Sequence, residues 1–284
     1  MPELPEIETL AAQLRPLVSG LVLSRISIGP SDGKASSRAV EAGLKRVLKT
    51  PKLILEQKLP GKKIEGVVRR GKFLAFQIEG ALSLWFHLGM TGQLLWGAEK
   101  KDRHSHVVLE FQGSDVKLTF RDIRKFGKIF LTNGTTDTQP DSIRLLGPEP
   151  SQINAQAFAL LFKKRTGRIK SLLLNQRILA GLGNIYTDES LFRAGIDPRR
   201  RACKIPLVKL EALHTAVKQT LNEAIAHGGS SIDDYVHADG QRGGFQKLHR
   251  VYGRFKKSCI QCKTLIKRVR LAGRSSFFCP QCQT

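Results

Sequence analysis

The sequence is short of carboxylates. It has 24 Asp and Glu residues against 47 Lys and Arg, which gives a formal net charge of +23 and an isoelectric point near 10.2. Such an excess is larger than solubility requires, so it points to a polyanionic partner. Nucleic acid fits best, and an anionic membrane fits less well.

Carboxylates are missing altogether from two long segments. None occurs from Ser151 to Thr187, although six Lys and Arg residues lie between Lys163 and Arg177. None follows Asp239, yet eleven Lys and Arg residues run from Arg242 to Arg274. One such run is usually a solvated basic face, but two in one chain predict a track for phosphate groups.

Long apolar runs are absent as well. No stretch approaches the ~18 residues of a membrane-spanning helix, and the acidic first residues do not resemble a signal peptide. We therefore expect a soluble, cytoplasmic, nucleoid-associated monomer that binds no membrane. Its 284 residues have room for two compact domains, or for one large domain and a small module.

Cysteine is scarce, and its placement is informative. Four of the five cysteines form two C-x-x-C pairs that are separated by sixteen residues: Cys259, Cys262, Cys279 and Cys282. This spacing predicts one structural Zn²⁺ on a β-hairpin, with disulfides or an iron–sulfur cluster as alternatives. Four thiolates leave no open coordination position, so the metal would fold the hairpin and take no part in catalysis. Cys203 lies outside the set and is most simply a buried or incidental thiol.

The first eight residues, Met-Pro-Glu-Leu-Pro-Glu-Ile-Glu, suggest a nucleophile. Removal of Met1 would expose Pro2 as a secondary amine, and an α-amino group titrates near ~7.7–8.0, so much of it is neutral at working pH. Attack on a sugar carbon would give a permanently cationic iminium, which suits glycosidic displacement followed by β-elimination. Glu3 lies within reach as a general acid or base. The alternative is an ordinary amphipathic helix with prolines in its first turn.

The residues up to about Thr132 read as a helix followed by short strands. Ile7, Leu10 and Leu14 recur at helical spacing, and Pro16 and Gly20 close that segment. Alternating strands with tight turns then predict an antiparallel β-sandwich, and a short helix is expected from Ser36 to Leu48. The predicted strands are Leu21–Ile28, Lys63–Arg70, Lys72–Ile78, Leu82–His87, His106–Phe111, Val116–Phe120 and Lys128–Leu131.

Several polar or exposed positions in this half are candidates for function. Met90 follows a strand on a turn and is either a core residue or an apolar wedge between bases. Arg124 and Phe126 lie two apart on one side of an extended segment and could fill a gap in a base stack. His104 and His106 are either phosphate contacts or surface histidines.

Helical periodicity begins after a linker that is rich in Gly, Thr and Pro. The predicted helices are Ala155–Lys163, Ile169–Gln176, Ile185–Ala194 and Leu207–His227. Asn184 follows Gly181 and Gly183 as a predicted N-cap, and backbone N–H groups at such a helix start bind anions. The glycine-rich stretch 228–244 is either a flexible connection or a mobile cap over a bound base.

Taken together, these features resemble the bacterial formamidopyrimidine-DNA glycosylases, the 8-oxoguanine-DNA glycosylase/AP lyases of the Fpg/Nei family. The resemblance rests on motifs in one order along the chain: Pro-Glu-Leu-Pro-Glu, Arg-Gly-Lys, His-Leu-Gly-Met-Thr-Gly, Arg-Lys-Phe-Gly, Gly-Leu-Gly-Asn-Ile-Tyr, Val-Tyr-Gly-Arg and the four cysteines. It implies an α+β fold with an N-terminal antiparallel β-sandwich and flanking helices, a helix–two-turns–helix domain and a zinc-ribbon β-hairpin. The domains expected are 1–133, a linker 134–150, 151–245 and 246–284.

The resemblance also implies roles for individual residues. Pro2 would be the nucleophile, Glu3 the general acid/base, and Lys72 would lie near the phosphate of the lesion. Met90, Arg124 and Phe126 would fill the void left by a flipped nucleotide. The backbone-phosphate contacts would be His104, Lys170, Asn184 and Arg274.

The partner implied is double-stranded DNA with an oxidised base or an abasic site, and the reaction is excision of oxidised purines followed by β,δ-elimination. Leu4 matches the purine-lesion enzymes, whereas Ile123 and Gln241 depart from the usual proline and lysine. The basic excursion from about Pro30 to Gly61 is longer than expected and has no assigned role. Two alternatives stay open: an endonuclease VIII-type glycosylase for oxidised pyrimidines, and a catalytically silent damaged-DNA-binding protein.

Overall fold

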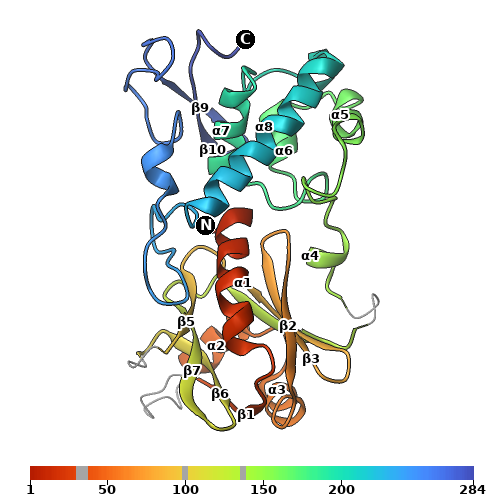
Figure 1. Cartoon of the computed structure of the whole chain (residues 1–284), viewed down its shortest axis with the longest axis vertical. Helices are drawn as coiled ribbons and strands as arrows, with labels where there is room; N and C mark the ends of the chain where they lie inside the picture. Colours follow the sequence, from red (N-terminus) through yellow and green to blue (C-terminus); the bar gives the residue numbers. More distant parts are fainter. Residues whose placement is uncertain (30–37, 98–101, 135–138) are drawn as a thin grey trace. The chain divides into compact units, whose positions relative to one another are not determined.

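The computed structural model describes residues 1–29, 38–97, 102–134 and 139–284, with only the backbone described for 38–42 (Figure 1). The chain forms two units, residues 1–144 with 228–244, and residues 145–227 with 245–284. The segment 228–244, which we expected in the domain 151–245, therefore groups with the first unit. Part of the expected linker, residues 135–138, lies outside the described residues.

The first unit contains two four-stranded antiparallel sheets, with strand orders β1-β6-β7-β5 and β2-β3-β4-β8. The predicted antiparallel sandwich is thus confirmed. The strands are β1 Leu23–Ile28, β2 Ile64–Arg70, β3 Phe73–Ile78, β4 Leu82–His87, β5 Gly92–Trp96, β6 Ser105–Phe111, β7 Ser114–Asp122 and β8 Lys128–Thr132.

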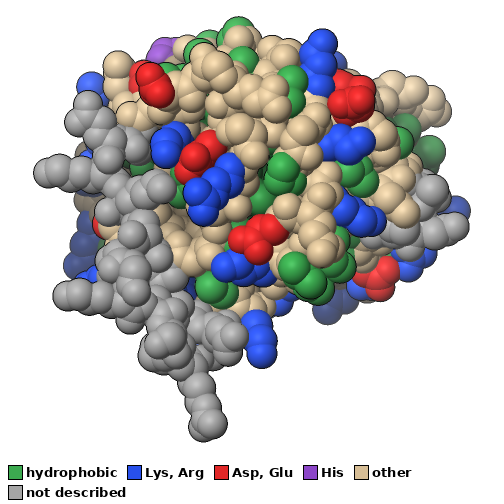
Figure 2. Space-filling view, turned by 90° about the horizontal axis from the view of Figure 1, so that it is seen from below, with side chains coloured by type: hydrophobic (Ala, Val, Ile, Leu, Met, Phe, Trp, Pro, Cys, Tyr) green, Lys and Arg blue, Asp and Glu red, His purple; other side chains and the backbone are tan. Residues whose placement is uncertain are grey.

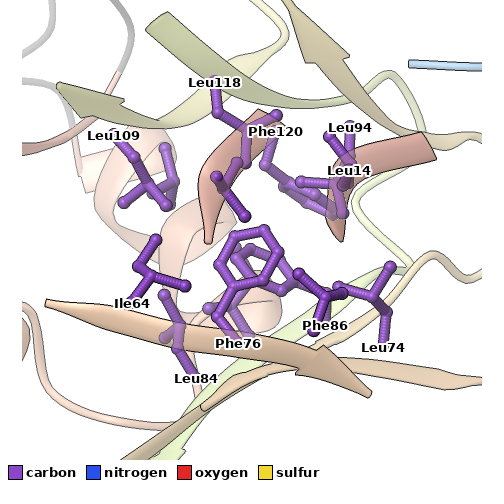
Figure 3. Close-up of a cluster of buried hydrophobic side chains, with 14 of the residues drawn as sticks. Leu14, Ile64, Leu74, Phe76, Leu84, Phe86, Leu94, Leu109, Leu118 and Phe120 are labelled. Carbon is purple, nitrogen blue, oxygen red and sulfur yellow. The ribbon is translucent and has the colours of Figure 1, made fainter. Parts of the chain in front are cut away.

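Alternation along the strands builds the core between the sheets. Because successive side chains on a strand point to opposite faces, every second residue of β3 and β4 is apolar and enclosed. Figure 3 shows Phe76 and Phe86 from one sheet opposite Leu118 and Phe120 from the other, with Leu14 of helix α1 in the same cluster. Helix α1 (Leu4–Val18) is therefore part of the core; it continues through Pro16 and ends before Gly20, the second of the two residues expected to close it.

Two short helices occupy the basic excursion. Helix α2 spans Arg38–Val47 and α3 spans Lys52–Lys58; the two serines at the start of the expected helix 36–48 lie outside the described residues. The segment between these helices lies against strand β8. The Lys49 N–H donates to the Ile129 carbonyl at 2.8 Å, and the Leu131 N–H donates to Thr50 Oγ1 at 2.8 Å.

The second unit combines helices with one β-hairpin. Its elements are α5 Ala155–Lys163, α6 Ile169–Leu173, α7 Asn184–Arg193, α8 Leu207–Ala226, β9 Lys267–Leu271 and β10 Arg274–Phe278, and the short helix α4 Asp141–Arg144 precedes them in the first unit. Helix α6 ends three residues before the expected Gln176. The side chains of Phe192, Val251 and Ile266 form a small core with the cysteines, so the hairpin packs on α7.

The first unit is close to balanced in charge. It holds 24 Lys and Arg and 18 Asp and Glu residues. Figure 2 shows basic and acidic side chains interspersed on the described part of one face. Within the described part of the chain, no helix combines the length and apolar character that crossing a bilayer requires.

Candidate active site and nucleic-acid interface

The start of helix α1 fixes the position of Pro2 and Glu3. The Glu3 N–H donates to Glu6 Oε2 at 2.7 Å as part of a capping box, which satisfies backbone donors at the helix start. Pro2 and Glu3 are both buried, whereas Met1 is exposed. The chain therefore holds the predicted nucleophile and the predicted acid on a capped helix end.

The segment 228–244 is anchored on the same helix end. The Ser230 N–H donates to Glu6 Oε1 at 2.7 Å, and the Tyr235 hydroxyl donates to the Glu6 carbonyl at 3.1 Å. Gly229 has φ +76°, and a Cβ there would lie 2.8 Å from Glu6 Oε1. Sequence reasoning missed Glu6, although its capping-box position three residues after Glu3 was a readable signal.

Lys72 lies on a two-residue hairpin that is tied to α1. Arg70 pairs with Phe73 across the turn, and Gly71 provides the positive φ that such hairpins need. Arg69 donates to Glu8 Oε2 at 2.6 Å and to the Gly71 carbonyl at 3.2 Å. The Arg69–Glu8 pair thus connects the turn that holds Lys72 to the helix that holds Pro2 and Glu3.

Met90, Arg124 and Phe126 are exposed on two turns that lie against each other. Met90 is 38% exposed and Phe126 is 47% exposed, and the Arg124 guanidinium lies 4.7 Å from the centre of the Phe126 ring. A Cβ at Gly89 would lie only 2.6 Å from the Phe126 carbonyl carbon, so only glycine allows this approach. The structure brings these three predicted void-filling residues together, and it excludes Met90 from the core.

One buried carboxylate holds both turns. Asp122 is fully buried; its Oδ2 accepts the Gly127 N–H at 2.7 Å, and its Oδ1 accepts the Thr91 hydroxyl and the Arg124 N–H. The Arg124 N–H also reaches Thr91 Oγ1 at 3.1 Å. Sequence reasoning did not single out Asp122 or Thr91, because no local pattern indicates which carboxylate will be enclosed.

The two neighbouring histidines have different surroundings. His106 is buried, and its Nε2 lies 2.7 Å from the Asp122 carbonyl, so it belongs to the sheet. Burial lowers the pKa of His106 below its ordinary value. His104 is partly exposed beside Arg103 and is available to a phosphate.

His87 is a candidate that the sequence analysis missed. Its Nδ1 accepts the Gly89 N–H at 3.2 Å, which leaves Nε2 to carry the proton of the neutral ring. Burial, then the charges of Lys72 and Lys128, lower the pKa of His87 to about 4. His87 is therefore a neutral donor next to Lys72.

Lys170 is not available to DNA as we predicted. Its side chain is fully buried, and its amine donates to Asp188 Oδ1 at 2.7 Å and to the Ser275 carbonyl at 3.1 Å. A buried charge requires a partner, and Asp188 provides one. We therefore correct the prediction: Lys170 joins α6, α7 and β10 and makes no direct phosphate contact.

Asn184 contacts the strand that carries Arg274. Asn184 Nδ2 donates to the carbonyl of Ser275, the residue after Arg274, at 3.0 Å, and Arg274 itself is exposed. Gly183 is the N-cap of α7 and Asn184 is the first helical residue, so the helix begins one residue earlier than we predicted. Helix boundaries vary by this amount, and the start of α7 remains a group of N–H donors beside the backbone of the strand that carries Arg274.

Basic side chains dominate the exposed surface of the second unit. It contains 23 Lys and Arg residues but only six Asp and Glu. Four of these six carboxylates are buried, Glu149, Asp188, Glu189 and Asp197, and Glu223 pairs with Arg193 and Arg250. The excess positive charge therefore faces solvent, as a nucleic-acid surface requires.

The four cysteines are arranged to bind one metal ion. Their Sγ atoms all lie within 4.8 Å of one another, with Cys262 and Cys279 3.4 Å apart and Cys259 and Cys282 3.9 Å apart. A tetrahedral zinc site with bonds of about 2.3 Å spaces its sulfurs about 3.8 Å apart. The Gln261 N–H and the Cys282 N–H also donate to Sγ atoms, so the cluster fits one structural Zn²⁺.

Models of known families match most of the chain. The formamidopyrimidine-DNA glycosylase N-terminal domain matches residues 1–129, and the formamidopyrimidine-DNA glycosylase H2TH domain matches residues 146–236. A zinc finger found in FPG and IleRS matches residues 256–284. The three matches follow the order of the sandwich, the helices and the cysteine hairpin.

Full-length relatives agree with these matches. The formamidopyrimidine-DNA glycosylase of Solibacter usitatus is 43% identical over 100% of this chain and 99% of its own, and that of Listeria monocytogenes is 36% identical over the whole of both chains. Among solved structures, a Lactococcus lactis FPG mutant in complex with a Fapy-dG containing DNA has a TM-score of 0.87 at 33% identity, with both chains fully covered. MutM in complex with carbocyclic 8-oxo-G containing DNA has a TM-score of 0.86, also at 33% identity and full coverage. On full-length sequence identity and shared architecture, the chain belongs to the formamidopyrimidine-DNA glycosylase family.

Proposed function

We propose that this protein is a bifunctional DNA glycosylase/AP lyase that removes 8-oxoguanine and formamidopyrimidines from double-stranded DNA. One observation carries the assignment of the site: Pro2 and Glu3 are fixed at the capped start of α1, and the Arg69–Glu8 pair ties the Lys72 turn to that helix. The choice of substrate rests on similarity to the relatives named above. The protein would act as a cytoplasmic monomer on DNA.

The proposed reaction begins with Pro2 as a free secondary amine. Its nitrogen attacks C1′ of the deoxyribose, and the glycosidic bond breaks with its electron pair on the base, which takes up a proton. The Pro2 nitrogen loses its own proton, Glu3 donates one to the ring oxygen, and the sugar opens to an iminium.

Two eliminations and a hydrolysis complete the proposed reaction. Loss of the C2′ proton expels the 3′ phosphate, and loss of the C4′ proton in a second elimination expels the 5′ phosphate. Each elimination breaks a C–O bond whose electron pair leaves on a phosphate. Water then hydrolyses the iminium, which releases the sugar fragment as an aldehyde and frees the Pro2 amine. The buried Lys72 amine would bind the phosphate of the lesion and hold the sugar in place.

The remaining candidate residues would bind and open the duplex. Met90, Arg124 and Phe126 would fill the void left by the extruded nucleotide, because they are exposed, adjacent and rigidly supported. Three residues would contact backbone phosphates: His104, Asn184 and Arg274. A Zn²⁺ ion held by the four cysteines would fold the β9–β10 hairpin and supply no step of the reaction.

Borohydride trapping tests this function. With DNA containing 8-oxoguanine, the mature protein should form a covalent adduct that peptide mapping assigns to Pro2. Pro2→Gly should slow base release greatly while lesion binding stays intact, and Pro5→Ala serves as the control because it leaves the nucleophile in place. An adduct on a lysine, or an active protein that retains Met1, would contradict the proposal.

A second candidate is an enzyme for oxidised pyrimidines. One solved relative, the wild-type Lactococcus lactis Fpg, is in complex with DNA that contains an oxidised pyrimidine, and it has a TM-score of 0.86 at 33% identity. Comparing the release of 8-oxoguanine with that of thymine glycol under single-turnover conditions decides between the two. A silent binding protein would show neither release nor trapping.

A further inference from the structure

The outer face of the sheet β2-β3-β4-β8 carries a cluster of aromatic rings. Because Leu74, Phe86 and Ile129 face the core, their neighbours in sequence face the other way. The Phe73 and Phe130 rings are 6.2 Å apart between centres, and Trp85 stacks on Phe130 at 6.3 Å with an 11° angle between the planes. The proposed function uses none of these rings.

A pocket of about 690 Å³ lies over this cluster. Phe73, Phe130 and His87 provide flat rings, and Thr50 and Ser142 provide hydroxyl groups. Lys49 and Lys128 provide two positive charges, and none of the described lining residues is acidic. The volume lies within the range of sites that bind small molecules. Aromatic rings beside cations are the combination with which proteins bind the unpaired bases of single-stranded nucleic acid.

The two lysines are close enough to repel each other. Lys128 Nζ donates to the Arg46 carbonyl at 2.6 Å, and partial burial, followed by the charge of Lys49, lowers the pKa of Lys128. Lys49 is exposed, but its backbone is fixed against β8 by the N–H bond to the Ile129 carbonyl. An anion between the two amines would relieve the repulsion.

The pocket is next to the turns that carry the proposed void-filling residues. Phe126 lines it as well, and the neighbouring Lys125 reaches helix α2, where its Nζ would lie 2.5 Å from a Cβ at Gly43. The basic excursion, which had no role in the sequence analysis, thus supplies Lys49 and Thr50 to a site beside Phe126. Because Phe126 is one of the proposed void-filling residues, DNA bound there would lie beside this pocket.

We propose that this pocket binds a phosphate-bearing terminal nucleotide at a DNA strand break, with the base on Phe73 and Phe130 and the phosphate between Lys49 and Lys128. A terminal phosphate carries close to two negative charges at pH 7, which matches two ammonium groups better than an internal phosphodiester does. The inference rests on the proposed function, because β,δ-elimination leaves a one-nucleotide gap with a phosphate at each end. A base beside the gap has lost a stacking neighbour and is free to lie on the rings.

The test compares gapped duplexes that differ only in their ends. One carries phosphates on both sides of a one-nucleotide gap, two carry a single 3′ or 5′ phosphate, and one carries hydroxyl groups only. The wild-type protein should bind the doubly phosphorylated gap roughly fivefold more tightly than the hydroxyl gap in fluorescence anisotropy, the scale of a partly exposed charged contact. The singly phosphorylated duplexes identify which end is bound.

Matched variants locate the effect. Lys49→Glu should abolish the preference for phosphate ends, whereas Lys58→Glu, an exposed lysine of the same excursion, should retain it. Phe130→Leu should retain the phosphate preference but lose the difference between a terminal nucleotide with a base and one without. Equal binding of all four gaps by the wild type, or a preference that survives Lys49→Glu, overturns the proposal.

Excision assays separate this inference from the proposed function. Lys49→Glu should release 8-oxoguanine in a single turnover at the wild-type rate, because the pocket acts on the cut product. If the wild type shows no excision, the proposed function fails, and a phosphate-end preference that Lys49→Glu abolishes still supports the pocket. If excision proceeds and the preference is absent, the pocket alone is refuted.

Discussion

At the scale of single residues, buried carboxylates decide where the functional backbone lies. Glu6 binds the start of α1 and Ser230, and Asp122 binds the two void-filling turns. Glu189 accepts three successive N–H groups, those of residues 250–252, at 2.8–2.9 Å. An ionised carboxylate has two acceptor oxygens, so one side chain can hold several N–H donors that belong to segments distant in sequence.

Asp122→Asn should loosen the void-filling turns. The amide keeps the size of the side chain but places an NH₂ group against backbone donors, and an unsatisfied buried donor costs about 1–3 kcal/mol. We expect excision of 8-oxoguanine from a duplex to slow by roughly tenfold, which corresponds to about 1.4 kcal/mol. Cleavage of a preformed abasic site, where no base has to be extruded, should slow less.

The control for this variant is Asp115→Asn, an exposed carboxylate of the same strand β7. Its excision rate should equal that of the wild type. Melting curves of all three proteins separate a local effect from unfolding. Equal slowing of excision and abasic-site cleavage by Asp122→Asn would mean that Asp122 supports the fold and has no specific effect on base extrusion.

His87 makes stability depend on pH. Its pKa is lowered from 6.5 to about 4 in the folded protein, so between these values the unfolded chain binds a proton that the folded chain does not. The contribution of neutral His87 to the free energy of unfolding should therefore be fully present above pH 6.5 and should fall as the pH drops toward 4. Between pH 6.5 and pH 4, His87→Gln should lose roughly 1–3 kcal/mol less unfolding free energy than the wild type. The range is kept below the value of the full pKa shift, because His87 is half-buried and solvent weakens the electrostatic effect.

Urea unfolding at a series of pH values measures this effect. The exposed His227→Gln variant is the control, and it should follow the wild-type curve. His249, whose pKa is also lowered to about 4 by burial, keeps part of the acid sensitivity in every variant. An unchanged slope in His87→Gln would show that His87 is not held neutral.

At the scale of elements, turns and helix ends present the functional groups, and the sheets hold them in place. Lys72 lies on a hairpin between β2 and β3, and Met90 and Phe126 lie on the turns that flank β5 and β8. Asn184 is the first residue of α7 and contacts the start of strand β10. Backbone groups at such ends lack partners within their own element, so they are free to bind a ligand.

Lys170→Met tests the role assigned to the α6–α7–β10 junction. Removing the amine leaves Asp188 buried without its cation, which should destabilise the second unit by about 3–5 kcal/mol. The double variant Lys170→Met/Asp188→Leu should recover part of that loss, as seen in thermal melts. The exposed Lys164→Met serves as the control. Weaker DNA binding by Lys170→Met without a lower melting temperature would instead support the direct phosphate contact that we predicted from the sequence.

At the scale of the whole molecule, charge is divided unevenly between the two units. The second unit carries 23 Lys and Arg against six carboxylates, and the first carries 24 against 18. The catalytic candidates Pro2, Glu3 and Lys72 are in the nearly balanced unit. Chemistry and much of the electrostatic attraction for DNA are therefore assigned to different parts of the chain.

DNA binding should weaken steeply as salt is added. Each phosphate neutralised by Lys or Arg releases counterions, so log Kobs should fall linearly with log salt, with a slope of about −0.9 per contact. Arg274→Ala should weaken binding and reduce the magnitude of the slope by roughly one. Anisotropy titrations with an abasic-site duplex provide the values, and a slope near zero would remove the polyanion argument.

Much of the fold and part of the site were predictable from the sequence. The alternating strands, the helical stripes and the C-x-x-C spacing are local patterns, and the structure confirms the sandwich, the helices and the cysteine cluster. Met90, Arg124 and Phe126 were chosen from their turns and are exposed together. Lys170 was chosen from its basic surroundings, and that choice was wrong because Asp188 approaches it from another helix.

The sequence by itself determined the charge, the order of the motifs, the cysteine spacing and the strand pattern, because these depend on neighbours along the chain. Tertiary structure alone decided that His106 is enclosed while His104 is reachable, that Asp122 holds two turns, and that segment 228–244 attaches to Glu6. It also decided that Lys49 of the basic excursion lines the same pocket as Phe73 and Phe130. Burial and partner choice depend on residues that are distant in sequence, so they are fixed only when the sheets and helices pack.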